Sequence, residues 1–227
     1  MTSQPKLLLV DDEPAIRRLL AAALARAGYR IVEAGNAREA MNALQIDKPD
    51  AALLDLGLPD RDGLELVPLL KAAGVALIVI SARDATEQKV TALDLGADDY
   101  VTKPFDTEEV LARIRTALRH RLAQSAGAAR VTIGAVEIDL DARAVRRDGA
   151  PVHLTPKEYA FLAELAKHPG KVVTHSQLLR EVWGPGHESD VEYLRVAVRG
   201  VRKKLGEDVA GGSIVRNEPG VGYRLLD

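Results

Sequence analysis

Five polar side chains stand at the ends of short apolar runs in the first half of the sequence. They are Asp11, Asp12, Asp55, Ser81 and Lys103. An apolar run of a few residues, bounded by turn residues, is typical of a buried strand. In open sheets of parallel strands, ligands bind beyond the carboxyl ends of the strands. We therefore expect these five side chains to meet at one edge of a sheet.

The types of these side chains suit phosphoryl transfer to a carboxylate. Three carboxylates in one crevice repel one another unless a cation lies among them, and Mg²⁺ prefers carboxylate and water oxygens. The ammonium of Lys103 would pair with a further oxygen, and the Ser81 hydroxyl would offer a hydrogen bond. In this interpretation Asp55 is the nucleophile, while Mg²⁺ and Lys103 neutralise charge on the transferred group.

Each side chain also has an ordinary structural explanation. Asp11 or Asp12 would cap the helix that follows, and Asp55 would cap the turn after its strand. Taken singly, Ser81 and Lys103 are more often a turn residue and a solvated charge. Their joint occurrence at successive strand ends favours one site over these separate explanations.

The sequence contains no glycine-rich loop that would hold a nucleotide, since neither GxGxxG nor GxxxxGK[ST] occurs. We therefore expect the phosphoryl group to arrive from a donor bound elsewhere. A rival interpretation is a small phosphatase or phosphotransferase with an aspartate nucleophile. Against it, Gly57 stands two residues after Asp55, where a second general acid would be needed. We expect a protein that is not an enzyme.

Strand and helix patterns alternate five times along the first half. The expected strands cover 6–10, 30–33, 51–54, 75–80 and 99–101, and the expected helices cover 14–27, 36–46, 64–73, 86–95 and 106–121. This alternation predicts an α/β fold, a doubly wound five-stranded parallel sheet of the flavodoxin-like type. The nearly continuous apolar strands agree, because such strands are covered on both faces.

The motifs VDDEP, LLDLGLPDRDG, ISAR and GADDYVTKPF together cover this half of the chain. Through them, residues 1–122 resemble the phosphoacceptor receiver domain of bacterial two-component response regulators. The resemblance implies that Asp55 accepts phosphate from the phosphohistidine of a sensor histidine kinase. It also implies that Asp12, Asp55 and the carbonyl of Gly57 hold Mg²⁺, with Asp11 adding charge partly through water.

The same resemblance assigns switching and dimerisation roles. Ser81 and Tyr100 match the switch positions, Lys103 matches an invariant lysine, and the Lys103–Pro104 bond is expected to be cis. Four charged residues resemble the pairs through which one subfamily forms a homodimer on phosphorylation. They are Lys89 with Glu109, and Asp99 with Arg113, each pair across the two-fold axis. The alternative for Glu109 and Arg113 is an ordinary exposed helix pair.

After residue 122 the pattern changes. Residues 123–130 are small and polar and predict a linker. Short strands are expected over 131–133, 136–140, 144–146 and 152–154, helices from Thr155, Thr174 and Ser189, and a hairpin over 213–226. Three helices followed by a hairpin predict an α+β winged-helix domain over 131–227. Capping signals support all three helix starts. They are Thr155-Pro-Lys-Glu, Thr174-His-Ser-Gln, and Ser189 with Glu192.

The third of these helices carries both an apolar and a cationic stripe. The apolar stripe consists of Val191, Leu194, Val198, Val201 and Leu205. The cationic stripe consists of Arg195, Arg199 and Arg202, with Lys203 and Lys204 beside it. Such a helix suits a major groove lined by phosphates. The alternative is a solvated outer face that binds no DNA, which would leave a protein-interaction module.

The motifs LTPKEYAFL, GKVVTHSQLLREVW and GVGYR make this half similar to the effector domain of OmpR/PhoB-class regulators. The resemblance implies that the helix arginines approach bases and phosphates of promoter DNA, and that RNA polymerase is a partner. Arg216 and Arg224 of the wing would lie along the DNA backbone near the minor groove. Gly200 stands where many relatives carry a second arginine that reads bases, and Pro219 where some carry a wing arginine for the minor groove. The base contacts therefore stay open.

Within this class, LDLGLPDRDG, VHLTPKEY, VWGP and YLR are most similar to regulators of a potassium-uptake operon of the kdp type. A regulator of another operon is the alternative. The stimulus, the operator and the sign of regulation do not follow from the sequence.

Composition limits the location and the partners. The chain has 227 residues, no cysteine and a net charge of -2, so disulfides and thiolate metal sites are excluded. Residues 1–122 carry 16 Lys/Arg against 19 Asp/Glu, and residues 131–227 carry 14 of each, so a DNA-binding surface must be local. The N-terminal apolar run is too short for a signal peptide, and no run reaches membrane-spanning length. We expect a cytoplasmic protein.

Overall fold

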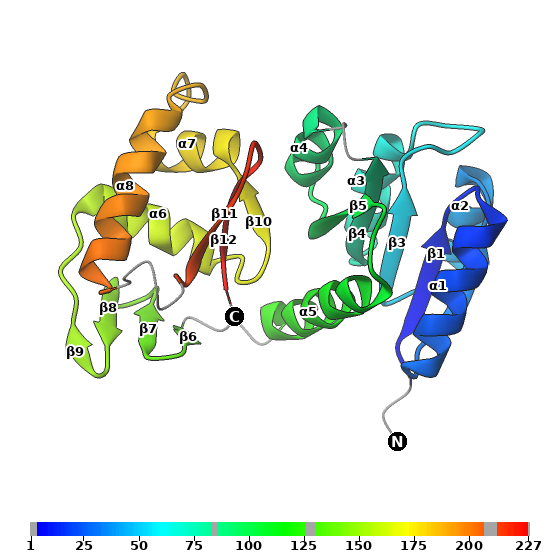
Figure 1. The fold of residues 1–227 in the computed structure, drawn as a ribbon, viewed down its shortest axis with the longest axis horizontal. Coiled ribbons are helices and arrows are strands. Elements are labelled where there is room, and N and C mark those ends of the chain that lie inside the picture. Colours follow the sequence, from blue (N-terminus) through cyan, green and yellow to red (C-terminus); the bar gives the residue numbers. More distant parts are fainter. Residues whose placement is uncertain (1–3, 83–85, 126–129, 207–212, 227) are drawn as a thin grey trace. The chain divides into compact units, whose positions relative to one another are not determined.

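The computed structural model describes residues 4–82, 86–125, 130–206 and 213–226. They form two compact units that divide between Arg121 and Leu122 (Figure 1). We call residues 1–121 the first unit and residues 122–227 the second unit.

The first unit is an α/β sandwich. Its elements are β1 (Lys6–Val10), α1 (Pro14–Arg26), β2 (Arg30–Ala34), α2 (Ala37–Asp47), β3 (Ala51–Asp55), the 3-10 turn η1 (Gly63–Glu65), α3 (Leu66–Ala72), β4 (Ala76–Ala82), α4 (Thr86–Asp94), β5 (Asp99–Lys103) and α5 (Thr107–Ser125). The five strands are parallel in the order β2-β1-β3-β4-β5, which confirms the predicted sheet. Leu7 and Leu9 pack with Leu20 of α1 and Ile114 of α5 in one core.

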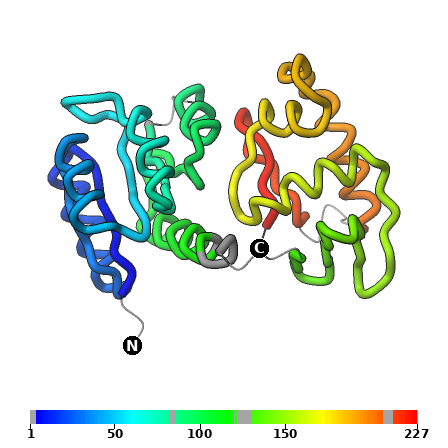
Figure 2. Tube along the Cα trace, turned by 180° about the vertical axis from the view of Figure 1, so that it is seen from behind, coloured from blue at the N-terminus to red at the C-terminus, as the bar shows by residue number. Residues whose placement is uncertain are grey.

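The second unit joins two small antiparallel sheets to three helices. The first sheet contains β6 (Arg130–Ile133), β7 (Val136–Asp139), β8 (Ala144–Arg147) and β9 (Ala150–Pro151), in that order. The helices are α6 (Pro156–Ala166), α7 (His175–Trp183) and α8 (Val191–Lys204). The second sheet has the order β10-β12-β11, with β10 (Val172–Thr174), β11 (Val215–Glu218) and β12 (Gly222–Leu225). Figure 2 shows the red hairpin β11–β12 folded back beside the yellow β10. One core contains side chains from both sheets and all three helices.

Several boundaries differ from the sequence-based prediction. The expected strand over 152–154 is wrong, because β9 ends at Pro151 and the chain leaves the sheet to cap α6. There Thr155 accepts from the backbone N–H of Glu158, and Glu158 accepts from that of Thr155, as the capping box predicts. Strand β10 was not predicted, since three residues are too few for a periodic signal.

The predicted start of α8 at Ser189 is also wrong. The residue before this helix is Asp190, and it makes no side-chain cap because its carboxylate lies 2.8 Å from His187 Nδ1. The expected linker 123–130 begins inside α5, which continues to Ser125, and its last residue, Arg130, opens β6. Residues 126–129 of that linker lie outside the described residues.

Candidate functional site

Three carboxylates meet at the carboxyl edge of the first unit's sheet. Ligand oxygens of Asp11, Asp12 and Asp55 all lie within 4.8 Å of one another. The cluster forms because β1 and β3 are neighbours with Val10 opposite Leu54, so both strands deliver their acids at the same level. Asp11 and Asp55 are buried and Asp12 is exposed. Hard oxygen donors so arranged fit Mg²⁺, an ion that usually keeps several waters.

Lys103 bridges the two buried acids. Its Nζ lies 2.5 Å from Asp55 Oδ2 and 3.0 Å from Asp11 Oδ2, and it reaches Glu13 Oε1 at 3.4 Å. Burial acts to lower the pKa of the ammonium, but hydrogen bonds to Asp55 and Asp11 outweigh it and hold that pKa above its usual range. Burial also raises the pKa of Asp11, against the backbone N–H of Glu13 and the charge of Lys103. Glu13 was not predicted as a site residue, although it continues the acidic run of the VDDEP motif.

Ser81 carries the one buried side-chain polar atom that lacks a hydrogen-bond partner within the described residues. It follows Ile80, which pairs with Asp55 across β3 and β4, so its hydroxyl belongs to the same sheet edge. An unpaired buried hydroxyl costs free energy, because it has lost water without replacing it. An oxygen-rich group added at Asp55 would supply the missing partner.

The loop after Asp55 is held by contacts at its start, at its end and at its tip. The Gly57 N–H donates to Asp55 Oδ1 at 3.2 Å, and a Cβ on Gly63 would lie 2.6 Å from the Leu56 Cα, so only glycine fits there. At the tip, the Asp60 carboxylate accepts from the first N–H groups of α2, those of Ala37 at 2.8 Å and Arg38 at 3.0 Å. The loop that carries the Gly57 carbonyl is therefore tied to a neighbouring helix.

The residues predicted for switching and dimerisation also lie together. The Lys103–Pro104 bond is cis, as expected. The Lys89 side chain is buried, and its Nζ lies 5.5 Å from the centre of the half-buried Tyr100 ring. Arg113 donates to Asp99 Oδ2 at 2.7 Å and to Glu109 Oε1 at 2.6 Å within one chain.

Those contacts are made within one chain, and the predicted ion pairs between two chains stay predictions. Asp99 and Arg113 were expected to meet across a two-fold axis, yet one chain already joins them. Lys89 was expected to reach Glu109 of another chain, yet here it is folded against Tyr100. Burial acts to lower the pKa of Arg113, but the charge of Asp99 outweighs it and raises that pKa.

In the second unit, α8 presents only part of its predicted cationic stripe. Arg195, Arg199 and Lys203 are exposed, whereas Arg202 is half-buried. Its guanidinium donates to Ser213 Oγ at 3.1 Å and to the Val215 carbonyl at 2.5 Å. The outward placement predicted for Arg202 is therefore wrong, because this side chain fastens α8 to the start of β11.

The two wing arginines differ in solvent exposure. Arg216 is exposed, but Arg224, directly opposite on β12, is only 8% exposed. Arg224 donates to Glu218 Oε1 at 3.0 Å and to the Gly170 carbonyl at 2.6 Å. The Arg224 guanidinium is therefore bonded within the wing, and its contact with the DNA backbone stays a prediction.

Gly200 has a structural explanation. A Cβ at this position would overlap Glu158 Oε1, so the helix surface here faces the start of α6. Glu158 also forms an ion pair with Lys204 at 2.6 Å. Burial acts to raise the pKa of Glu158, but the hydrogen bond from Lys204 outweighs it and lowers that pKa. Lys204 is therefore drawn towards α6 and away from the outer face.

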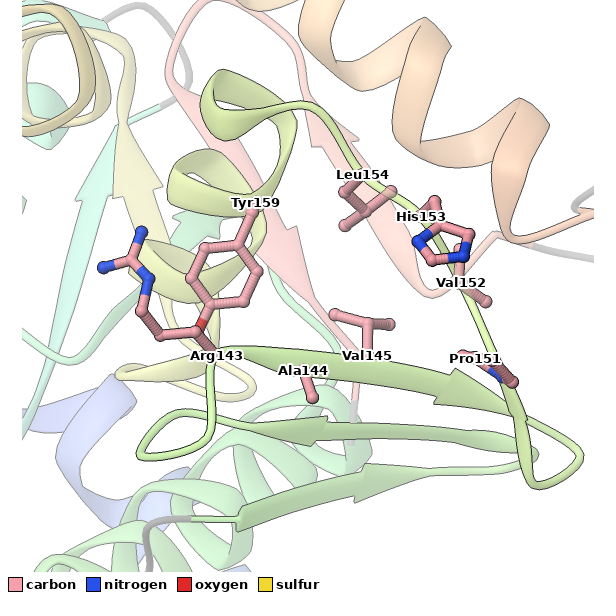
Figure 3. Close-up of a pocket in the computed structure, with 8 residues that line it drawn as sticks. All are labelled: Arg143, Ala144, Val145, Pro151, Val152, His153, Leu154 and Tyr159. Carbon is pink, nitrogen blue, oxygen red and sulfur yellow. The ribbon is translucent and has the colours of Figure 1, made fainter.

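A separate cavity of about 260 Å³ lies beside β8 and the start of α6 (Figure 3). Its walls include Val145, Val152 and Leu154, and Arg143 lies beside Tyr159 with the guanidinium carbon 4.8 Å from the ring centre. The lining contains no carboxylate, so the chemistry of the acid cluster is not repeated there.

Residues 7–115 match the response regulator receiver domain, and residues 149–225 match the C-terminal domain of transcriptional regulatory proteins. The chain is 44% identical over 220 residues to the KDP operon transcriptional regulatory protein KdpE of Escherichia coli (strain K12), covering 96% of this chain and 98% of that protein. It is 40% identical over 229 residues to KdpE of Staphylococcus aureus (strain NCTC 8325 / PS 47), covering 98% and 97%.

This chain is an OmpR/PhoB-class response regulator. Among solved structures it is similar to the response regulator DrrB of Thermotoga maritima, an OmpR/PhoB homologue, with a TM-score of 0.50, 28% identity and coverage of 99% of this chain and 100% of that one. The first unit alone is similar to a CheY-like receiver domain protein of Methanospirillum hungatei JF-1, with a TM-score of 0.51, 30% identity and coverage of 54% and 99%.

Family membership assigns the two units of the response regulator. The first unit is the receiver, and the second unit is the DNA-binding effector of a transcriptional regulator. The acid cluster with Lys103 lies in the receiver, and α8 and the wing lie in the effector. Among the described residues, no helix is both long and apolar enough to cross a membrane.

Proposed function

We propose that this response regulator takes a phosphoryl group on Asp55 from a sensor histidine kinase and controls transcription of a potassium-uptake operon of the kdp type. The observation that carries the first part is the Lys103 ammonium, 2.5 Å from Asp55 Oδ2, beside the unpaired Ser81 hydroxyl. The second part is supported by 44% identity over nearly the whole length to a protein named as a KDP operon regulator.

The chemical step is in-line transfer. An Asp55 carboxylate oxygen attacks phosphorus, the bond from phosphorus to the donor imidazole nitrogen breaks, and an acyl phosphate forms. The imidazole leaves with the electron pair of that bond. Mg²⁺ held by Asp12, Asp55 and the Gly57 carbonyl would neutralise charge on the phosphoryl oxygens. Lys103, already charged and held between the acids, would keep one of its contacts on the product.

The acyl phosphate would then change the surroundings of Asp55. A group of charge near -2 replaces a carboxylate and brings new acceptor oxygens. The Ser81 hydroxyl would gain its missing partner, and Tyr100 would turn into the space that Ser81 leaves. Because Lys89 lies over the Tyr100 ring, that rotation would remove this contact of Lys89 and change which side chains α4, β5 and α5 expose.

The changed surface of α4, β5 and α5 is the proposed homodimer contact. Glu109 is exposed and Arg113 joins it to the buried Asp99, so a released Lys89 of another chain would find a carboxylate there. A dimer places two effectors on one promoter, which raises affinity by linking two binding events. In the effector, Arg195, Arg199, Lys203 and Arg216 would contact duplex DNA, and RNA polymerase is the expected further partner.

An experiment with three readouts tests the whole proposal. The protein is incubated with acetyl phosphate and Mg²⁺, and binding to its own promoter is measured at several salt concentrations. We expect phosphoprotein to form, dimers to appear, and promoter affinity to rise, with affinity falling steeply as salt increases. Phosphorylation without any gain in DNA binding would contradict the regulatory proposal. Continuous hydrolysis of a small phosphate ester would instead favour an enzyme.

A further inference from the structure

Arg17 of α1 holds the backbone of the acidic segment that follows β1. This arginine is half-buried, and its Nη1 donates to the backbone carbonyl of Asp11 at 2.6 Å. Its Nε lies 3.6 Å from Glu33 Oε2, so the guanidinium has a charged partner on β2. The Asp11 N–H donates to the Ala34 carbonyl at 3.2 Å. Both backbone polar groups of Asp11 are therefore fixed, in addition to its carboxylate.

The Asp11 carbonyl belongs to the peptide group that leads into Asp12. A peptide group is planar, so the direction of this carbonyl sets the plane that contains the nitrogen and Cα of Asp12. Asp12 is exposed, so its backbone has a large share in placing its carboxylate. The hydrogen bond from Arg17 thereby orients the start of a side chain that would hold Mg²⁺.

The loop that carries the Gly57 carbonyl is tied to the chain between β2 and α2. Asp60, at the tip of this loop, accepts hydrogen bonds from the N–H groups of Ala37 and Arg38. We call residues 34–38 the β2–α2 junction. It contains the last residue of β2 and the first two residues of α2.

The acidic segment after β1 is tied to the same junction. Ala34 accepts from the Asp11 N–H, and Arg17 packs against Gly35. A Cβ at Gly35 would lie 3.3 Å from Arg17 Nη1, so a residue larger than glycine would press on the guanidinium. The two segments that carry the proposed Mg²⁺ ligands are therefore held against one short piece of backbone.

Mg²⁺ makes such a common support useful, because it requires nearly octahedral geometry with oxygens about 2.0–2.1 Å away. We propose that Arg17 and Asp60 are positioning residues, which use the β2–α2 junction to set the separation of the two segments that Mg²⁺ needs. The inference rests on the proposed function, in which Mg²⁺ assists phosphoryl transfer to Asp55. Neither positioning residue belongs to the acid cluster itself.

The charge of Arg17 makes the test decisive. A guanidinium near a cation site repels the cation, so its removal would tighten Mg²⁺ binding if charge alone mattered. If Arg17 acts by orienting the Asp11 carbonyl, its removal weakens Mg²⁺ binding, because groups that orient metal ligands contribute strongly to metal affinity. The two explanations predict opposite changes.

Isothermal titration calorimetry of the full-length protein with MgCl₂ measures the dissociation constant. We expect Arg17→Met to raise this constant about tenfold. The Mg²⁺ concentration that gives half the maximal rate of labelling by acetyl phosphate should rise in parallel, while the rate at saturating Mg²⁺ changes by less than about twofold. Arg18→Met is the matched control, because Arg18 is the next residue of α1 and is exposed, and it should bind Mg²⁺ as the wild type does.

A second substitution tests the shared support. Asp60→Ala should also weaken Mg²⁺ binding, although Asp60 lies on the other segment. The double variant should bind Mg²⁺ about as well as the weaker single variant, because the separation is already unrestrained once either tie is lost. Losses that multiply in the double variant would overturn the common role of the β2–α2 junction.

The remaining outcomes separate the inference from the proposed function. If the wild type takes up no phosphoryl group, the proposed function fails, and calorimetry still decides the inference. If Arg17→Met binds Mg²⁺ as tightly as the wild type or more tightly, the inference is overturned, whereas labelling of the wild type leaves the proposed function standing. Circular dichroism checks folding. Should Arg17→Met not fold, Arg17→Gln, which is polar but shorter, replaces it with the same expectations.

Discussion

Asp55 Oδ2 and Lys103 Nζ lie 2.5 Å apart although 48 residues separate them in the chain. They stand on β3 and β5, with β4 between these strands in the sheet. The lysine thus spans a strand to reach the phosphoacceptor, and it neutralises Asp11 from the same position. The receiver holds its nucleophile in an ion pair in this way, and several consequences can be measured.

Asp55→Asn should abolish labelling by acetyl phosphate and leave the fold intact. The amide keeps the shape of the carboxylate but is not nucleophilic towards phosphorus. The measurement is mass spectrometry of the intact protein, with circular dichroism as the check on folding. Asp62→Asn is the matched control, because Asp62 lies on the same loop and its side chain only caps η1. Labelling of the Asp55→Asn variant at the wild-type level would rule out Asp55 as the acceptor.

Lys103→Met should lower the stability of the receiver by about 1–3 kcal/mol when divalent ions are chelated. Removing one partner leaves buried carboxylates uncompensated, although partial exposure of the lysine reduces the cost. Mg²⁺ should recover part of the loss, since it neutralises the same acids.

Urea unfolding followed by circular dichroism gives this measurement for Lys103→Met. Trp183, the single tryptophan, lies in the effector, and its fluorescence transition should not move. Equal stability of the variant and the wild type in chelator would show that the bridge contributes nothing.

Arg224→Met should mainly lower the stability of the effector, whereas Arg216→Met should mainly weaken its binding to DNA. Arg224 is buried with Glu218 and the Gly170 carbonyl as partners, so its loss should destabilise the effector by about 2–4 kcal/mol. Arg216 is exposed, so its loss should change stability by less than about 0.5 kcal/mol while weakening DNA binding. Trp183 fluorescence in urea measures the first effect, and titration with promoter DNA measures the second. Equal stabilities of the two variants would contradict the assignment.

Gly200→Ala and Glu158→Ala should not be additive. Alanine favours a helix over glycine by about 1 kcal/mol, but a Cβ at Gly200 must displace the Glu158 carboxylate. The gain should therefore appear only where Glu158 has already been shortened. We expect a coupling free energy of about 1 kcal/mol between the two substitutions, measured by urea unfolding of the four proteins. Simple additivity would show that the two side chains do not compete for this space.

Much of the receiver could be predicted from sequence because its signals are local. Each strand is a short apolar run, and each of Asp11, Asp55, Ser81 and Lys103 ends or follows one. Parallel pairing then brings them to one edge whatever the loops do. Glu13 was missed, since its contact with Lys103 depends on side-chain reach and not on strand position.

The effector was harder to predict because its side chains have competing partners. Helical spacing placed Arg202 near the outer face, but an arginine is long enough to turn back to the Val215 carbonyl. Alternation along β12 could not reveal that Arg224 meets Glu218 and the Gly170 carbonyl, because neither partner lies on that strand. Strand β10 is defined only by its partner β12.

The Asp60 carboxylate gives the phosphorylation loop a remote reporter. Both of its oxygens are hydrogen-bonded to backbone amides at the beginning of α2, so any loosening of the loop exposes the amides of Ala37 and Arg38 to solvent. Deuterium uptake at these two positions should slow when the loop becomes ordered around a bound ion and quicken when the ion is withdrawn. Amide exchange at the start of α2 would thereby report whether the acid cluster holds an ion, although α2 contacts neither the phosphate nor the DNA.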